Sequence, residues 1–377
     1  MLVRKDEEGR RVMERKQMEQ LFFIQRDATV GVTDGAISFA NPAALARYPD
    51  LAIGTPATVL LPTEILTQTE DNFSASATVR DEICTVLGSR VEETRIYTLI
   101  PQTKPDMEAG RLLENVCNSM RRTLTVLNMA TELLTPAIDQ LEEPRQQSNI
   151  KAINKSYYKL QRLCDNLDHL ARLPQGKERP RLEHVDLVDF CRDLVQSADH
   201  FVRKQGHKLY FQSELAQLVT AVDSPKLSKL LLNLISNSLK RLPQGGSLHL
   251  NLSSSGEDVT LAFRDSGEGI PPTELAHVFT QYQREPSGTD TKAGVGLGLA
   301  VAQEIASLHG GTLLLSSNEG KGTTVLLRLP IQRLEADGVL QETALPYGEG
   351  DDGGMHRILM ELADVLDDEA FGRKYRD

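Results

Sequence analysis

The chain has 377 residues, of which 40% are hydrophobic and 25% charged, so it is long enough for two or three domains and too apolar for wholesale disorder. Its 42 Lys and Arg residues stand against 53 Asp and Glu residues, and the net charge of -11 argues against a nucleic-acid-binding protein that acts through bulk charge. The charge is uneven, because residues 334–377 hold twelve carboxylates and four Lys or Arg residues, a local balance of -8.

The spacing of the cysteines and the length of the apolar runs indicate in which cellular compartment the protein is expected. Cys84, Cys117, Cys164 and Cys191 are widely separated with no CxxC pair, which indicates neither a disulfide framework nor a zinc site. No apolar run approaches the ~20 residues that span a bilayer, and the opening MLVRKDEEGRRVMERK is charged where a secretory signal needs an apolar stretch. We therefore expect a cytoplasmic protein with reduced thiols, no membrane insertion and no nucleic-acid partner.

The first hundred residues favour a small α+β domain behind a polar lead. Residues 1–20 carry apolar residues at loose helical spacing, which predicts a helical lead. Within residues 21–103, TVGVTDGAISFAN alternates around Asp34-Gly35, a dipeptide typical of tight hairpin turns, and RVEETRIYTLI alternates again. A short helix is predicted between them at NPAALARYPD. The hairpin, the short helix and the later strands resemble a PAS-type sensor domain.

Residues 106–174 carry two amphipathic helical patterns. Apolar residues recur every three or four positions over residues 112–134 and again over 150–170, and Pro136 is expected to end the first helix. Two helices of about 28 residues, each roughly 40 Å long, joined by a short connection predict an antiparallel hairpin. One hairpin cannot cover its own apolar faces, so we expect a homodimer in which two hairpins form a four-helix bundle.

Residues 181–331 follow a polar, proline-flanked linker and interleave helices with strands. Helices are expected at VDLVDFCRDLVQSADHFV, KLSKLLLNLISNSLKRL and GLGLAVAQEIASLHG, and strands at SLHLNLSS, DVTLAFRDS, TLLLSS and TTVLLRLP. This order predicts an α/β sandwich with one sheet covered by helices, and an α+β multidomain fold for the whole chain.

Residues 332–377 form an acidic, glycine-rich tail with one amphipathic helix, MHRILMELADVL. Its charge makes a solvated appendage the first expectation. Docking on the body of the protein and binding to a basic partner are the alternatives.

The first of three polar clusters is LLLNLISNSLK. Asn233 and Asn237 are four residues apart on one helix face, and Lys240 follows one turn later, so two amides and a cation project from the same side. An amide oxygen is a suitable ligand for Mg²⁺, which also keeps waters and takes phosphate oxygens as ligands. A helix whose polar residues simply face solvent is the alternative.

The other two clusters are rich in glycine. In DSGEGIPP, Asp265 presents a carboxylate at the end of a strand, and Gly267 and Gly269 let the main chain approach a ligand; an ordinary turn is the alternative. In GVGLGLAVAQEIASLHGG, three alternate glycines precede an apolar helix, so backbone N–H groups at the helix start are accessible to an anion. These glycines are Gly294, Gly296 and Gly298.

The three clusters in this order make residues 181–331 resemble the ATP-binding domain of sensor histidine kinases, within the superfamily shared with gyrase, heat-shock chaperone and mismatch-repair ATPases. VFTQYQRE matches the family's aromatic box, and NEGKGTTVLLRLP its closing strand pair. The resemblance implies that Asn237 holds Mg²⁺, that Asn233 and Lys240 face the phosphates of ATP, and that Asp265 binds the adenine amine. The three alternate glycines would hinge a lid over the nucleotide. The resemblance also places Gly267, Gly269, Phe279, Tyr282, Arg284, Lys292, Leu299 and Thr323 in the nucleotide site.

Two residues depart from the family pattern in this site. Four residues before Asn233 the family has Glu or Gln, and this chain has Lys229, which would alter phosphoryl transfer while sparing binding. Where the family often has Tyr or Phe against adenine, this chain has Arg241, which either stacks as a planar cation or lies on the surface.

The helical hairpin resembles the family's dimerisation and phosphoacceptor domain, with a changed acceptor box. The family box reads approximately SHELRTPL, and CNSMRRTL stands here, so Asn118 takes the histidine position. An amide cannot accept a phosphoryl group as an imidazole does, because its nitrogen lone pair is delocalised. Ser119 and His169, the first histidine in the chain, are weaker acceptor candidates, and a structural role is the simpler interpretation of both.

These features together predict a homodimeric protein of two-component signalling that binds ATP and Mg²⁺ and whose autophosphorylation on histidine is impaired or absent. It would act with a response regulator or with another kinase. Three alternatives stay open: a serine or protein kinase of the same ATPase superfamily that acts on a partner protein, a non-catalytic ATP-binding scaffold, and a relic domain that no longer binds ATP.

Overall fold

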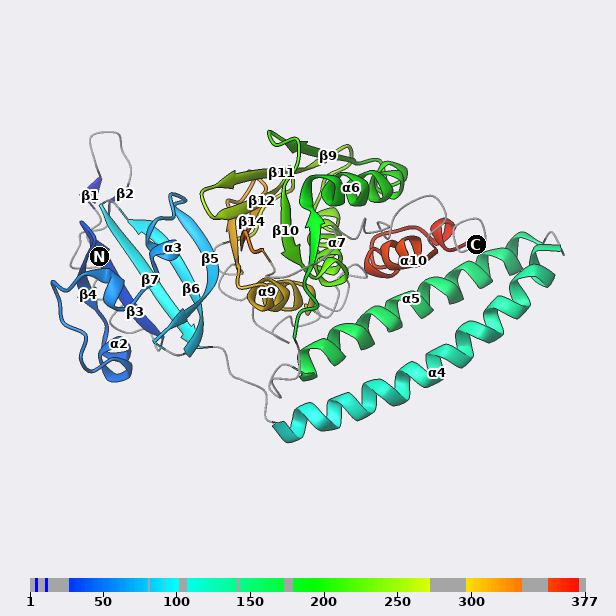
Figure 1. Cartoon of the computed structure of the whole chain (residues 1–377), viewed down its shortest axis with the longest axis horizontal. Helices are drawn as coiled ribbons and strands as arrows, with labels where there is room; N and C mark the ends of the chain where they lie inside the picture. The colour runs from blue at the N-terminus through cyan, green and yellow to red at the C-terminus, as the bar shows by residue number, and fades with distance from the viewer. Residues whose placement is uncertain are drawn as a thin grey trace. The chain divides into compact units, whose positions relative to one another are not determined.

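A computed structural model describes residues 4–5, 11–12, 27–80, 82–91, 93–101, 107–140, 143–172, 179–271, 296–333 and 352–372 (Figure 1). The chain divides into two compact units, Met1–Thr103 and Lys104–Asp377. The first unit holds a sheet with short helices, and the second holds the helical hairpin and the α/β domain (Figure 1). The expected α+β multidomain fold with a helical hairpin and an α/β sandwich is confirmed.

The first unit contains an antiparallel sheet with the strand order β4-β3-β7-β6-β5. Its strands are β3 (Ala28–Thr33), β4 (Ala36–Ala40), β5 (Asn72–Val79), β6 (Glu82–Val91) and β7 (Thr94–Pro101), and its helices are α2 (Pro42–Arg47), η1 (Ala57–Val59) and α3 (Thr63–Leu66). The predicted hairpin turn is present between β3 and β4, where Asp34 and Gly35 have φ values of 52° and 75°. Both values lie in the left-handed region that such a turn requires.

Two further details of the first unit test the sequence expectations. The short helix predicted after Phe39 is α2, and the Asn41 side chain caps it by accepting a hydrogen bond from the Ala44 N–H. The helical expectation for the lead is wrong for the described part of it, because β1 (Arg4–Lys5) and β2 (Arg11–Val12) pair as antiparallel strands. A loose apolar spacing in a polar stretch is a weak helix signal. The other residues of 1–20 lie outside the described ranges.

In the second unit the predicted hairpin consists of α4 (Met107–Gln140) and α5 (Pro144–Arg172). The helices are joined by ion pairs from Arg121 of α4 to Asp165 and Asp168 of α5, at 3.0 and 3.2 Å. The expectation that Pro136 ends the first helix is wrong, because α4 continues to Gln140. Proline removes one N–H donor but has a helical φ, so a final turn can continue with one hydrogen bond fewer.

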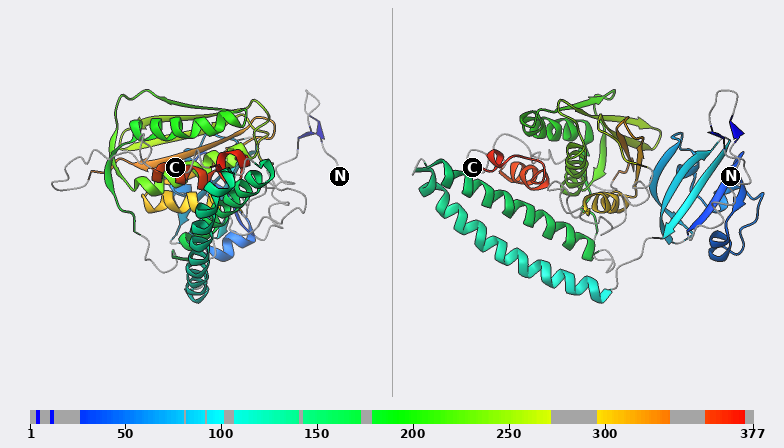
Figure 2. Two further views of the ribbon diagram at one scale, coloured as in Figure 1. Left: turned by 90° about the vertical axis from the view of Figure 1, so that its right-hand side faces the viewer. Right: turned by 180° about the vertical axis from the view of Figure 1, so that it is seen from behind.

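The rest of the second unit is an α/β sandwich. Its main sheet has the order β13-β14-β12-β11-β9, with β9 parallel to β11 and the other pairs antiparallel. The strands are β9 (Lys208–Ser213), β11 (Ser247–Ser255), β12 (Asp258–Asp265), β13 (Thr312–Ser317) and β14 (Thr323–Pro330), and a separate pair is formed by β8 (Glu183–Asp186) and β10 (Val219–Val222). Three helices cover one face of the main sheet: α6 (Leu187–Lys204), α7 (Ser224–Leu239) and α9 (Gly298–Leu308) (Figures 1 and 2).

The core of this sandwich lies between the sheet and these helices. Alternate strand residues such as Leu250, Leu261 and Leu327 are fully buried, whereas their neighbours are more exposed, as period-two patterning predicts. On the helix side, Leu231 and Ile305 are also fully buried. The helices and strands predicted over residues 181–331 are therefore present, and β8, β9 and β10 are additional strands that the sequence reading did not name.

The acidic tail differs most from its sequence-based expectation. Its described part, residues 352–372, comprises α10 (Asp352–Glu361) and η3 (Asp368–Phe371), and we call it the docked segment. It packs on α5 and α7 (Figure 1), and Leu359, Leu362 and Phe371 are fully buried. The expectation of a solvated appendage is wrong for these residues because the apolar face of the amphipathic helix is covered by the body of the unit.

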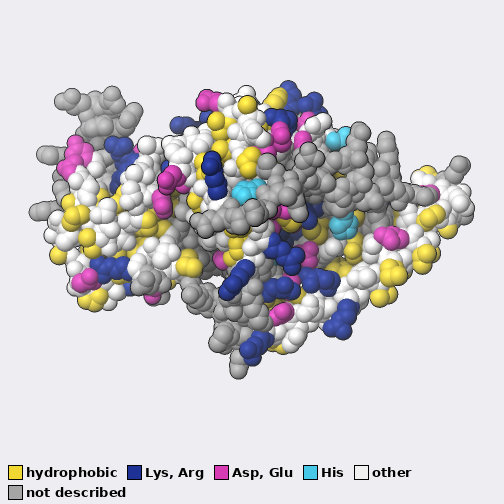
Figure 3. All heavy atoms as spheres, in the orientation of Figure 1, with side chains coloured by type: hydrophobic (Ala, Val, Ile, Leu, Met, Phe, Trp, Pro, Cys, Tyr) yellow, Lys and Arg dark blue, Asp and Glu magenta, His cyan; other side chains and the backbone are white. Residues whose placement is uncertain are grey.

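The outer surface of the hairpin carries large apolar side chains. They include Leu112, Val116, Val126, Leu127, Met129, Leu133, Leu134, Ile153 and Leu160. Figure 3 shows hydrophobic side chains along the hairpin among polar ones. Among the described residues, no helix is long and apolar enough to cross a membrane.

Candidate functional site

The end of β12 presents a carboxylate in a fixed position. Asp265 is 8% exposed, and its Oδ1 accepts hydrogen bonds from the backbone N–H groups of Gly267 and Thr323, at 2.9 and 3.0 Å. Its Oδ2 accepts one from the Ser238 hydroxyl of α7 at 3.1 Å. A Cβ at Gly267 would lie 2.9 Å from Asp265 Oδ1, so glycine is required for this turn to close around the carboxylate.

Two buried amides face the start of α9 from α7. The Nδ2 atoms of Asn233 and Asn237 are buried without a hydrogen-bond partner among the described residues. A Cβ at Gly298, the first residue of α9, would lie 2.9 Å from Asn233 Oδ1 and 3.5 Å from Asn237 Nδ2. The fold therefore brings together the asparagine cluster and the last glycine of the third cluster. Buried amide groups that lack protein partners are expected where a ligand supplies them.

The polar side of α7 also holds an ion-pair network that the sequence reading missed. The buried guanidinium of Arg162, on α5, donates to Asn233 Oδ1 at 2.7 Å and to the Ser236 hydroxyl at 3.3 Å. It also pairs with Glu361 at 3.0 Å and with Asp364 at 2.9 Å, two carboxylates of the docked segment. The ion pairs therefore join α5, α7 and the docked segment.

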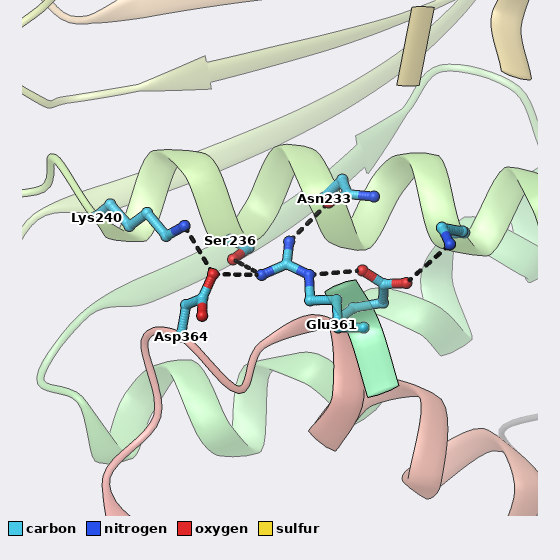
Figure 4. Close-up of polar contacts among 7 residues, drawn as sticks. Asn233, Ser236, Lys240, Glu361 and Asp364 are labelled. Carbon is cyan, nitrogen blue, oxygen red and sulfur yellow. Dashed lines mark hydrogen bonds and ion pairs between the residues drawn. The ribbon is translucent and has the colours of Figure 1, made fainter. Parts of the chain in front are cut away.

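Two lysines of the predicted site end in the same network. Lys240 Nζ lies 3.0 Å from Asp364 Oδ2, and Figure 4 shows the Asp364 carboxylate linked both to Lys240 at the end of α7 and to the central guanidinium. Lys229 Nζ lies 3.9 Å from Glu361 Oε1, and the Glu361 side chain is fully buried. The lysine that departs from the family pattern thus has its counter-charge in the docked segment.

The Asp364 carboxylate of the docked segment is held as an anion by its neighbours. Burial acts to raise the pKa of Asp364, but the charges of Lys240 and Arg162 and the hydrogen bond from Lys240 outweigh it, so the pKa lies below its ordinary value. The docked segment therefore carries negative charge at the place where phosphates are predicted to bind.

The remaining described residues of the predicted site lie around these groups. Arg241 is half-buried and its Nη1 donates to the Gly269 carbonyl at 3.4 Å, so it contacts the DSGEG turn. Gly269 and Gly296 both have a φ of 76°, which a residue with a side chain adopts only with strain. Leu299 packs against the hydrophobic core. The other predicted contacts, Phe279, Tyr282, Arg284, Lys292 and Gly294, lie outside the described residues.

The predicted acceptor positions lie on the hairpin. Asn118 is half-buried and Ser119 is exposed, both on α4, whereas His169 on α5 is buried. His309 is also buried: its Nδ1 donates to the Ile305 carbonyl at 2.7 Å and its Nε2 accepts from the Asp223 N–H at 2.9 Å. Both ring nitrogens of His309 are thus used by backbone groups, as a structural role requires.

The donor set fits a magnesium nucleotide. The structure provides a buried carboxylate at Asp265, amides with unpartnered Nδ2 atoms at Asn233 and Asn237, and a glycine helix start at Gly298. A carboxylate acceptor suits an adenine amine, and amide oxygens suit Mg²⁺. Among the described residues no group of three or more His, Cys, Asp or Glu side chains could hold a metal ion.

Comparison with known proteins identifies this domain. Residues 222–333 match the family of histidine kinase-, DNA gyrase B- and HSP90-like ATPases. The alginate biosynthesis sensor protein KinB of Pseudomonas aeruginosa is 29% identical over 217 residues, which cover 57% of this chain and 36% of that protein. Sensor histidine kinase WalK of Bacillus subtilis is 28% identical over 247 residues, covering 64% of this chain and 40% of that protein.

A solved structure supports the same fold. The crystal structure of full-length ShkA in complex with AMPPNP matches with a TM-score of 0.50 at 23% identity, covering 60% of this chain and 47% of that chain. By these matches, residues 222–333 carry the ATPase domain that histidine kinases share with DNA gyrase B and HSP90, and the chain is similar to sensor histidine kinases over more than half of its length. It spans 36% and 40% of the length of KinB and WalK.

Proposed function

We propose that the chain binds Mg·ATP in a two-component signalling system, and that its autophosphorylation on histidine is impaired or absent. The observation that supports binding is the convergence of Asp265, Asn233, Asn237 and Gly298, which come from three separate sequence clusters. The observation against autophosphorylation is Asn118, an amide at the position of the family's acceptor.

Each group of the site has a proposed task. Asp265 accepts a hydrogen bond from the adenine amine, and the backbone N–H groups that hold its Oδ1 keep the carboxylate oriented. Asn237 provides an amide oxygen to Mg²⁺, while Asn233 and Lys240 face the phosphates. The bound Mg²⁺ would neutralise phosphate charge. Lys229 stands where the family has Glu or Gln. Its ammonium group is a cation that cannot accept a hydrogen bond or a proton, as phosphoryl transfer would require of this side chain.

The proposed assembly is a homodimer through the hairpin. Leu127, Ile153 and Leu160 are all at least 40% exposed, and together with Tyr157 they line one groove between α4 and α5. A second hairpin would bury this groove in a four-helix bundle. We further propose that the first unit is a PAS-like sensor, in view of its hairpin, its short helices and its five-stranded sheet, that the protein is cytoplasmic, and that a response regulator or another kinase is its partner.

Calorimetry tests the nucleotide site. Titration of the whole chain with Mg·ATP should give saturable heat, and Asp265→Asn should weaken the affinity by roughly 10- to 100-fold, because a hydrogen bond to a charged group contributes about 1.5–3 kcal/mol. Ser254→Ala, a change at an exposed strand end, is the control and should bind as the parent chain does. No saturable heat from a folded chain would refute the proposal and favour a relic domain.

Mass spectrometry after incubation with Mg·ATP tests the missing transfer. The expected result is bound, uncleaved ATP and no phosphohistidine on this chain. Phosphohistidine at His169 would contradict the proposal. Phosphoserine on a partner protein would instead identify a protein kinase of the same superfamily.

A further inference from the structure

The docked segment covers the residues that the proposed nucleotide site needs for phosphate. Asp364 forms an ion pair with the Lys240 ammonium at 3.0 Å. Arg162 donates a hydrogen bond to Asn233 Oδ1 at 2.7 Å and is itself paired with Asp364 and Glu361. Figure 4 shows Asp364 and Glu361 facing the side of α7 that carries Asn233, Ser236 and Lys240. Lys240 and Asn233 are two of the residues assigned to the phosphates of ATP.

The carboxylates of the docked segment and the phosphates of ATP would repel each other if both lay beside Lys240 and Asn233. Two charges of like sign in contact repel each other more strongly near a protein surface than in bulk water, because the effective dielectric constant is lower there. Asn233 Oδ1 also accepts a hydrogen bond from the Arg162 guanidinium, which pairs with Glu361 and Asp364 of the docked segment, so this side chain is engaged by protein groups in the docked state. Docking and Mg·ATP binding therefore oppose each other on charge alone.

The docked segment has a separate anchor on α5 that does not touch the nucleotide residues. Lys151 pairs with Glu369 at 2.7 Å, and Lys155 pairs with Asp368 at 2.9 Å. Phe371 is fully buried, its ring lies 5.5 Å from that of Tyr158, and its carbonyl accepts from Asn154 at 3.2 Å. An anchor of this kind holds the carboxylates near α7 at a high effective concentration.

We propose that the docked segment, residues 352–372, is an autoinhibitory element that competes with the phosphates of Mg·ATP for Lys240 and Asn233. This inference rests on the proposed nucleotide site. The docked chain binds nucleotide weakly, and bound Mg·ATP releases Glu361 and Asp364 from α7. By linkage, whatever stabilises docking weakens nucleotide binding by the same factor. Release also uncovers the face of α5 around Arg162, so that nucleotide binding changes the surface that the hairpin presents.

Two isosteric variants of the whole chain separate competition from a general charge effect. Asp364→Asn removes the carboxylate that pairs with Lys240, and Glu369→Gln removes one from the same segment that pairs only with the distant Lys151. Asp364→Asn should tighten Mg·ATP binding on the order of tenfold, within the range usual for coupled sites. Glu369→Gln should change it less than about twofold, because an exposed ion pair contributes little. Adenosine, which has no phosphate, should bind both variants and the parent chain alike.

Hydrogen exchange gives a second readout that needs no variant. Saturating Mg·ATP should increase exchange over residues 352–372 and adenosine should not. Equal Mg·ATP affinity of the parent chain and Asp364→Asn, with exchange of the docked segment unchanged by bound ATP, would overturn this inference and leave the proposed nucleotide site intact. Failure of both the parent chain and Asp364→Asn to bind Mg·ATP or adenosine would overturn the nucleotide site and the inference with it.

Discussion

The two faces of α5 are built from different chemistry. One face holds Asn154, Tyr158 and Arg162, which are buried under the docked segment through hydrogen bonds and ion pairs. The other face holds Ile153 and Leu160, which are each at least 40% exposed. The covered face is specific, because a buried charge demands a defined counter-charge, whereas an apolar face accepts any complementary apolar surface. In the proposed homodimer, α5 would have a permanent apolar interface on one side and a switchable ionic contact on the other.

The largest effect is expected at the covered face. Arg162→Met leaves Glu361 fully buried without its close counter-charge, and breaking a buried pair in this way costs about 3–5 kcal/mol. Arg172→Met on the same helix, whose side chain is 40% exposed, should cost less than about 1 kcal/mol. Chemical denaturation measures both changes. The double variant Arg162→Met, Glu361→Met should recover much of the loss, and equal stability of the parent chain and Arg162→Met would mean that the covered face is not ionic in solution.

A substitution on the uncovered face of α5 should change the dissociation constant of the proposed dimer and leave the stability of the protomer unchanged. Leu160→Glu places a charge in the groove that also includes Leu127 and Ile153, and we expect the dimer to dissociate at least 100-fold more readily, from a lost burial of roughly 2–3 kcal/mol and the added desolvation of a carboxylate. Sedimentation measures the change. Ser148→Glu introduces the same charge at an exposed position of α5 outside the groove and is the matched control. A chain that is monomeric before any substitution would break the comparison.

The smallest expected effect is the acid sensitivity of the covered face. Because Lys240 and Arg162 lower the pKa of Asp364 against the effect of burial, its contribution to docking is present above the ordinary value of 3.8 and is lost as the pH falls through the lowered pKa. The protection of residues 352–372 against hydrogen exchange, taken relative to the intrinsic rate at each pH, should therefore fall as the pH drops below the ordinary value of 3.8, and less so in Asp364→Asn. The apolar groove contains no such group among its lining residues, so its association should not follow this pH dependence.

Short-range patterns in the sequence predicted most helices and strands of the fold. Hydrophobic periodicity predicted α5, α6, α7 and α9, and the Asp34-Gly35 dipeptide predicted the first hairpin, because helix period and turn geometry depend on neighbouring residues. Pro136 was misleading for a related reason, since a proline near a helix end removes one hydrogen bond without forcing the chain out of helical φ. The strands β8 and β10 are four residues each and have too little pattern to be recognised.

For the candidate site, the sequence predicted the residues whose type and short spacing carry the signal, such as glycines in a turn or at a helix start and asparagines four residues apart on one helix face. Gly267, Gly298 and Asn233 are examples: a Cβ at Gly298 would lie 2.9 Å from Asn233 Oδ1, and a Cβ at Gly267 would lie 2.9 Å from Asp265 Oδ1. Arg162 and Glu361 gave no such signal. They are 199 residues apart, and each occupies an ordinary polar position in an amphipathic helix.

The sequence by itself therefore determined most helices and strands of the second unit, the three clusters rich in asparagine or glycine and the amide at Asn118, because all of these depend on residue type and short spacing. Only the tertiary structure decided that the acidic segment docks, that Lys240 and Asn233 are engaged by Asp364 and Arg162, and that α5 has one ionic and one apolar face. The reason is physical. Pairing of charges across such separations depends on which surfaces the fold brings together, and the same carboxylates would be equally stable in water in the absence of that contact.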